Sequence, residues 1–96
     1  FVAVFLFGDY VRSEPVARFS ADVTSGGLPL TVQFTDESIF EPTSWAWDIN
    51  NDGTVDSTEQ NPSWTYSEAG TYTVTLTVTN AAGSDTVTKT DYVTVS

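Results

Sequence analysis

The segment from Asp48 to Glu59 carries oxygen-bearing side chains at the spacing of a calcium-binding loop. Counted from Asp48, these side chains stand at positions one, three, five, nine and twelve, which are Asp48, Asn50, Asp52, Asp56 and Glu59. Gly53 falls at position six, where such a loop turns sharply, and the main-chain carbonyl of Thr54 would add a ligand at position seven. Hard oxygen ligands suit Ca²⁺. The pattern therefore predicts a Ca²⁺ site with the ligands Asp48, Asn50, Asp52, Thr54 and Asp56.

A metal-free turn is the alternative interpretation of the same residues. Asn-Asp-Gly is common turn chemistry, and the carboxylate of Asp48 could accept hydrogen bonds from nearby backbone N–H groups. Against this, four carboxylates within one short loop repel one another and favour a bound cation. Mg²⁺ fits less well than Ca²⁺, because it rarely uses a cage built entirely from protein.

The flanking sequence does not fit the helix–loop–helix form of the calcium motif. The residues Trp45–Trp47 alternate like a strand, and Pro62 follows too soon for an exiting helix. Glu59 is left out of the predicted ligand set, because its placement at position twelve depends on that helix.

The residue types that are missing exclude most catalytic chemistry. The chain has 96 residues with no Cys and no His, so it lacks thiol and imidazole groups to act as nucleophile, general base or zinc ligand. Its 13 acidic residues outnumber three basic ones, and a formal net charge of −10 repels phosphate backbones and anionic lipid surfaces. We therefore expect one non-catalytic domain that binds no nucleic acid and does not insert into a membrane.

Hydrophobic and polar residues alternate along several short segments, which is typical of half-buried β-strands. The alternation is clearest over residues 70–79, where Tyr, Val and Leu occupy one face and threonines the other. Shorter alternations occur over residues 30–35, 45–49 and 64–66, and no segment has a helical period. This pattern predicts an all-β protein, an antiparallel β-sandwich of about seven strands.

The end of the chain predicts a tight turn and a bulged last strand. Residues 80–83 read Asn-Ala-Ala-Gly, a typical turn sequence. The following strand contains Val87, Val93 and Val95, but Lys89 shares their parity. We therefore expect a β-bulge between Thr88 and Tyr92 that resets the alternation.

The first residues differ from the rest in composition. Residues 1–7 form an apolar run that is too short to span a bilayer, and turn and joint residues follow it. The sequence thus predicts an apolar N-terminal segment or linker over Phe1–Ser13 and a β-sandwich domain over Glu14–Ser96.

The motifs within that domain resemble those of PKD (polycystic kidney disease) domains. The block Trp47–Gly53 is similar to the WDFGDG signature of the family, with Ile in place of Phe and one extra residue before Asp-Gly. Asn61-Pro62, Tyr66 and the stretch from Gly70 to Val78 resemble the second signature, and Tyr92–Val95 resembles the closing strand. The resemblance implies an immunoglobulin-like β-sandwich of the prokaryotic cell-surface type.

The resemblance also implies a role outside the cell. PKD domains occur as modules of surface-layer proteins, adhesins and secreted enzymes, so we expect an extracellular or cell-surface structural spacer that also serves as a protein–protein interaction or adhesion unit. The expected partners are other domains of the same chain or cell-surface proteins, and the expected state is a monomer. The alternative is an accessory module of a secreted enzyme that binds polysaccharide or a protein partner and is stabilised by calcium.

The aromatic residues bear on that alternative. Trp45 and Trp64 could form a platform for stacking sugars if both rings faced solvent in one plane. Trp47 and Tyr72 are expected in the core, because they alternate with aliphatic partners.

Overall fold

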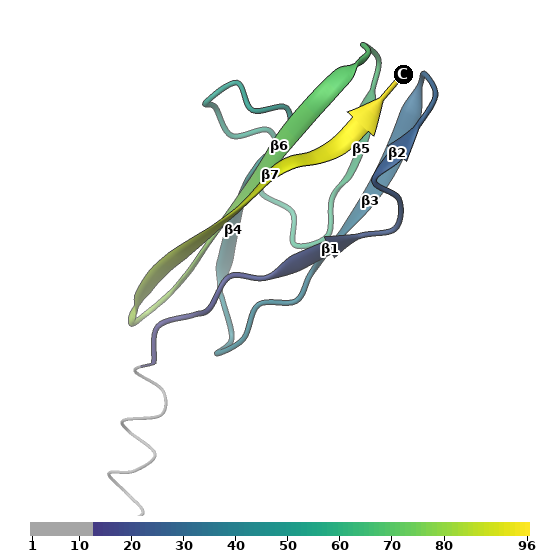
Figure 1. Ribbon diagram of the computed structural model, residues 1–96. Helices are drawn as coiled ribbons and strands as arrows, with labels where there is room; N and C mark the ends of the chain where they lie inside the picture. Colours follow the sequence, from purple (N-terminus) through teal and green to yellow (C-terminus); the bar gives the residue numbers. More distant parts are fainter. Residues whose placement is uncertain (1–12) are drawn as a thin grey trace, which may run out of the picture.

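A computed structural model describes residues 13–96, which form two β-sheets packed as a sandwich (Figure 1). The three-stranded sheet has the order β1-β3-β5, with bounds Phe19–Ala21, Leu30–Asp36 and Ser63–Tyr66. The four-stranded sheet has the order β2-β7-β6-β4, with bounds Ser25–Gly26, Gly83–Val95, Gly70–Asn80 and Ser44–Asp48. All pairings are antiparallel except that of β2 with β7. The predicted immunoglobulin-like β-sandwich of about seven strands is confirmed.

Strand β6 follows the alternation that its sequence predicts. Val74, Leu76 and Val78 have no exposed surface, whereas the intervening threonines lie on the outer face of the sheet. Some of these threonines pair across the strands, as in the 2.9 Å contact between the hydroxyls of Thr77 and Thr86. This face is half-buried rather than fully solvated, because β6 lies between β4 and β7.

An aromatic cluster fills the space between the two sheets. The ring of Trp47 lies 5.1 Å from that of Phe19 and 5.4 Å from that of Phe34, measured between centroids. All three side chains are almost completely buried. Phe19 and Phe34 come from the three-stranded sheet and Trp47 from the other, so the cluster joins the two sheets through its tilted ring contacts.

The predicted bulge is present in β7 and is confirmed. Tyr72 pairs with Val93, but Val74 pairs with Lys89, so three residues of β7 lie opposite one residue of β6. Asp91 takes up the extra length with a left-handed φ of 53°. The bulge lets Lys89 point inward and still places Val93 and Val95 in the core.

Lys89 caps one edge of the aromatic cluster. Its ammonium group donates a 2.7 Å hydrogen bond to the carbonyl of Phe19. The same nitrogen lies 4.7 Å from the centroid of the Phe19 ring and 4.9 Å from that of Tyr92. The Lys89 amine is thus committed to linking β7 with β1.

The two ends of β6 mark opposite ends of the domain. At one end, the predicted turn Asn80–Gly83 closes the β6–β7 hairpin, and the Asn80 side chain donates to the carbonyl of Ser13. At the other end, Gly70 pairs with Val95. The chain therefore enters beside one end of β6 and reaches the other end at its last strand (Figure 1).

The predicted N-terminal segment Phe1–Ser13 lies outside the described residues, except for Ser13. Within residues 13–96 there is no helix of the length and hydropathy that crossing a membrane requires.

Substituting Lys89 tests its capping role. Lys89→Met keeps most of the side-chain stem but removes the ammonium group, so the Phe19 carbonyl loses a charged partner. We expect the free energy of unfolding to fall by about 1–3 kcal/mol, measured by urea denaturation. Thr90→Ala, an exposed change in the same strand, should alter it by less than about 0.5 kcal/mol. Equal stability of Lys89→Met and the unmodified chain would contradict this role.

Candidate functional site

The acidic loop, residues 48–57, is anchored at both ends to Trp47. The backbone N–H of Trp47 donates to the carbonyl of Ser57 at 2.9 Å, and the N–H of Asp56 donates to the carbonyl of Trp47 at 2.7 Å. The indole N–H of Trp47 also donates to the carbonyl of Glu59 at 2.9 Å. Since the Trp47 side chain has no exposed surface, the core itself fixes where the loop leaves and returns.

Two carboxylates of the acidic loop hold its backbone. The oxygens of Asp48 accept hydrogen bonds from the N–H groups of Asp52 and Gly53, at 3.2 and 3.0 Å. One oxygen of Asp56 accepts from the N–H groups of Ile49 and Asn50, at 2.7 and 3.3 Å. These bonds are the turn chemistry of the metal-free interpretation, and they also turn the carboxylates inward.

The third carboxylate, that of Asp52, lies at the exposed tip. Its Oδ1 accepts from the backbone N–H and the hydroxyl of Thr54, at 2.9 and 2.8 Å. These bonds, followed by one from the Asn50 side chain, lower the pKa of Asp52. Gly53 follows with a φ of 85°, the left-handed conformation that position six requires and that glycine adopts without strain.

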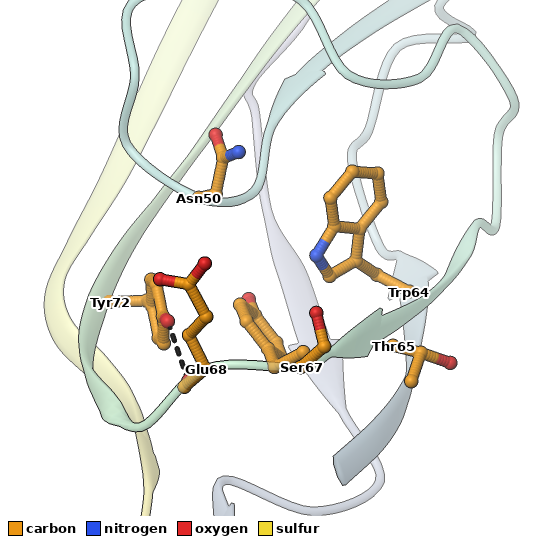
Figure 2. A pocket seen from close by; sticks show the side chains of 7 residues that line it. Asn50, Trp64, Thr65, Ser67, Glu68 and Tyr72 are labelled. Carbon is orange, nitrogen blue, oxygen red and sulfur yellow. Dashed lines mark hydrogen bonds between the residues drawn. The ribbon is translucent and has the colours of Figure 1, made fainter. Parts of the chain in front are cut away.

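The structure brings three of the predicted ligands into one cluster. Asp48, Asp52 and Asp56 each offer a carboxylate oxygen, and these oxygens lie within 4.8 Å of one another. The Oδ1 atom of Asn50 is buried and has no hydrogen-bond partner. Figure 2 shows this amide turned away from Glu68, on the side of the acidic loop.

Two other residues of the motif contribute no carboxylate to this cluster. Thr54 contacts Asp52 through its N–H and hydroxyl groups, and its carbonyl remains a predicted ligand. Glu59, at position twelve, is exposed and is not a member of the carboxylate cluster. Its main-chain carbonyl instead binds the Trp47 indole. The arrangement is that of a short loop, without the flanking helices that would bring position twelve inward.

Tyr66 supports the acidic loop from the three-stranded sheet. Its hydroxyl donates a 2.8 Å hydrogen bond to the carbonyl of Ile49, and its side chain is buried. Burial, with smaller contributions from Tyr72 and Asp56, raises the pKa of this hydroxyl well above its usual range. Tyr66 therefore stays protonated and keeps donating at any physiological pH.

The tryptophans do not form a shared platform. Trp45 belongs to the four-stranded sheet and Trp64 to the three-stranded sheet, and both are partly buried against the core. The indole N–H of Trp45 donates to Asp36 at 3.0 Å, which fixes this ring against the end of β3. Trp47 is in the core as predicted. Tyr72, which was also predicted there, is only partly buried and packs against the edge of the core.

A second polar site lies beside Trp64 and was not predicted from the sequence. It is a pocket of about 250 Å³ formed mainly by the end of β5 and the start of β6 (Figure 2). Glu68 is among its lining residues. A single glutamate in a short connection has no sequence signal that separates it from an ordinary solvated side chain.

The comparison with known families identifies the fold family of the chain. A family model described as the PKD domain matches residues 12–95. The chain belongs to the PKD domain family. Two motifs predicted this membership. The motif Trp47–Gly53 spans the end of β4 and the first part of the acidic loop, and the motif Gly70–Val78 lies in β6.

Similar proteins include parts of bacterial proteases. The pre-pro-metalloprotease PrtV of Vibrio cholerae is 47% identical over 74 residues, which is 75% of this chain but 8% of the relative. The crystal structure of the PKD1 domain from that protein superposes with a TM-score of 0.68 at 42% identity, covering 85% of this chain and 99% of the other. The PKD1 domain of Vibrio anguillarum Epp gives a TM-score of 0.69 at 41% identity, covering 88% of this chain and 98% of the other.

A third match comes from Methanosarcina mazei. A solution structure of a Methanosarcina mazei protein superposes with a TM-score of 0.61 at 37% identity, covering 82% of this chain and 52% of the other. Two of these structures are of PKD1 domains, and the curated relatives are far longer than this chain. The fold thus serves as one module within larger proteins.

Proposed function

We propose that this PKD domain is a non-catalytic spacer and interaction module of a larger extracellular protein, joined in its chain to an enzyme of the metalloprotease kind. The observation that carries the proposal is the 47% identity to a short part of a pre-pro-metalloprotease. A pre-pro form is a precursor with a leader and a propeptide, which is the form of an exported enzyme. Catalysis would then belong to other parts of such a protein. The interaction that we propose for this module includes attachment or adhesion at a cell surface.

The positions of Ser13 and Val95 at opposite ends of the sandwich support a spacer role. Ser13 lies beside Asn80 at one end of β6, and Val95 pairs with Gly70 at the other. Strand β6 has 11 residues, and at about 3.4 Å per residue its ends are roughly 35 Å apart. Polypeptide that leads into Ser13 and polypeptide that follows Val95 would meet the sandwich at points separated by its length.

The parallel pairing of β2 with β7 would resist tension between those ends. Three backbone hydrogen bonds join these segments. The N–H of Leu28 donates to the carbonyl of Ser96 at 3.1 Å, and the N–H of Ser96 donates to the carbonyl of Gly26 at 3.0 Å. The N–H of Thr94 donates to the carbonyl of Thr24 at 2.9 Å. Tension on Ser13 pulls β2 back along its own direction, while tension at the C-terminus pulls β7 forward. The bonds are therefore loaded together in shear rather than one after another.

Single-molecule unfolding tests the spacer role. The chain contains no cysteine, so cysteines introduced at Ser13 and Ser96 give unique attachment points. We expect a higher unfolding force for this pair than for attachment at Ser13 and Ala81, which lie at the same end of the sandwich. The force needed to unfold the domain depends on its unfolding barrier. In shear, all the β2–β7 hydrogen bonds must break together before that barrier is crossed. An equal or lower force between Ser13 and Ser96 would contradict a load-bearing role.

We further propose that the acidic loop binds Ca²⁺ through Asp48, Asn50, Asp52, Asp56 and the carbonyl of Thr54. The clustered carboxylate oxygens, the buried Oδ1 of Asn50 and the left-handed Gly53 support this proposal. A bound cation would offset the repulsion among the three carboxylates and give the Asn50 oxygen a partner. Calcium would thereby stiffen the loop that stands on Trp47.

Thermal unfolding with and without calcium tests this site. Free Ca²⁺ at about 100 times its dissociation constant should stabilise the chain by about 2.7 kcal/mol, because it binds only the folded state. The amide NMR signals of residues 48–56 should shift saturably. Asp52→Ala should abolish both effects, since it removes one carboxylate of the cluster.

Glu59→Gln is the matched control for the calcium experiment. It removes one negative charge from the same segment, but its carboxylate lies outside the cluster, so calcium binding should be unchanged. An absence of shifts at millimolar Ca²⁺ in the folded chain would show that the acidic loop is a metal-free turn. Loss of binding in Glu59→Gln would show that position twelve is a ligand after all.

A further inference from the structure

The pocket beside Trp64 is built from residues that already hold one another in place. The rings of Tyr66 and Tyr72 lie 4.5 Å apart between centroids, inclined by 34°. The hydroxyl of Tyr72 donates a 2.7 Å hydrogen bond to the main-chain carbonyl of Glu68, the dashed line in Figure 2. With the Tyr66 hydroxyl bound to Ile49, both aromatic rings are fixed before any ligand arrives.

Three polar groups remain free to meet a ligand in this pocket. Within the described part of the chain, Glu68 is hydrogen-bonded only through its main-chain carbonyl, and in Figure 2 its carboxylate lies beside Tyr72, on the side of Asn50. Ser67 lines the pocket with its hydroxyl, and Figure 2 shows the indole nitrogen of Trp64 turned toward the other lining residues. The pocket thus offers a full negative charge, a hydroxyl, one N–H donor and aromatic walls.

The volume and charge of the pocket restrict the ligand. A volume of about 250 Å³ lies below the range of pockets for multi-ring ligands and suits one long side chain. The chain carries 13 acidic and three basic residues, so its overall field attracts cationic groups. One of the basic residues, Lys89, is already bound to the carbonyl of Phe19. A neutral ligand would leave the Glu68 charge unused.

We propose that this pocket binds an arginine side chain of an adjacent polypeptide. The planar guanidinium pairs with the carboxylate of Glu68 and stacks on the partly exposed ring of Tyr72, which the buried Tyr66 supports from behind; a lysine ammonium matches this arrangement less well. A main-chain carbonyl of the polypeptide that carries this arginine accepts a hydrogen bond from the Trp64 indole N–H. The pocket would then give the module a defined contact with a basic segment of a neighbouring domain in the same, larger chain. This inference rests on the proposed interaction role, but not on the spacer or calcium proposals.

A titration with Nα-acetyl-arginine N-methylamide, followed by amide NMR, tests the pocket. The matched control probe is Nα-acetyl-citrulline N-methylamide, which has nearly the same shape but no charge. We expect saturable shifts centred on residues 64–72 with the arginine probe, a dissociation constant on the order of millimolar, and roughly tenfold weaker binding of the citrulline probe. Added salt should weaken the binding of the arginine probe.

Glu68→Gln should weaken the arginine probe roughly tenfold, because it removes the charge and leaves the fold contacts of the main chain intact. Glu41→Gln removes the same charge at the opposite end of β6, where the Asn80 side chain binds the carbonyl of Phe40. Binding should be unchanged in that variant. Equal loss in both variants would reveal non-specific charge attraction and overturn the proposal.

Two further outcomes would also overturn it. Equal binding of the arginine and citrulline probes would mean that the pocket does not recognise charge. Shifts with neutral oligosaccharides, but not with the arginine probe, would make the pocket a sugar site. In that case the interaction role of the module would survive. Failure of every probe would remove the interaction role. Loss of the shear resistance described above would separately remove the spacer role.

Discussion

The burial of Trp47 is the constraint on which the rest of the structure depends. Its ring fills the space between the sheets against Phe19 and Phe34, and its backbone and indole N–H fix the acidic loop through Asp56, Ser57 and Glu59. One side chain therefore couples the core to a surface loop. Neither the loop geometry nor the packing of the sheets could be altered at this position without disturbing the other.

The same anchoring explains how a strongly acidic loop keeps a defined shape. Three carboxylates are held close together although they repel one another, because backbone N–H groups of the loop donate to each of them and Tyr66 supports Ile49 from the opposite sheet. The polar groups are thus arranged in advance around one point. A cation at that point would add to an existing framework instead of creating it.

Much of the fold was predictable because short-range patterns determine it. The alternation along residues 70–79 fixed the inward face of β6, and the misplaced parity of Lys89 predicted the bulge that Asp91 forms. The ligand spacing likewise predicted the cluster of Asp48, Asp52 and Asp56. The contact of Lys89 with Phe19, the support by Tyr66 and the pocket at Glu68 depend on which strands face one another across the sandwich. Short-range sequence patterns do not contain that information.

Amide hydrogen exchange without calcium shows whether the core fixes the acidic loop. If the core fixes the acidic loop, the N–H groups of Trp47 and Asp56, which bind Ser57 and Trp47, should exchange only through global unfolding. Their exchange free energies should then equal those of the inward residues of β6, such as Leu76. Rapid exchange of Trp47 and Asp56 while Leu76 stays protected would show that the loop opens independently of the core, and would contradict the account.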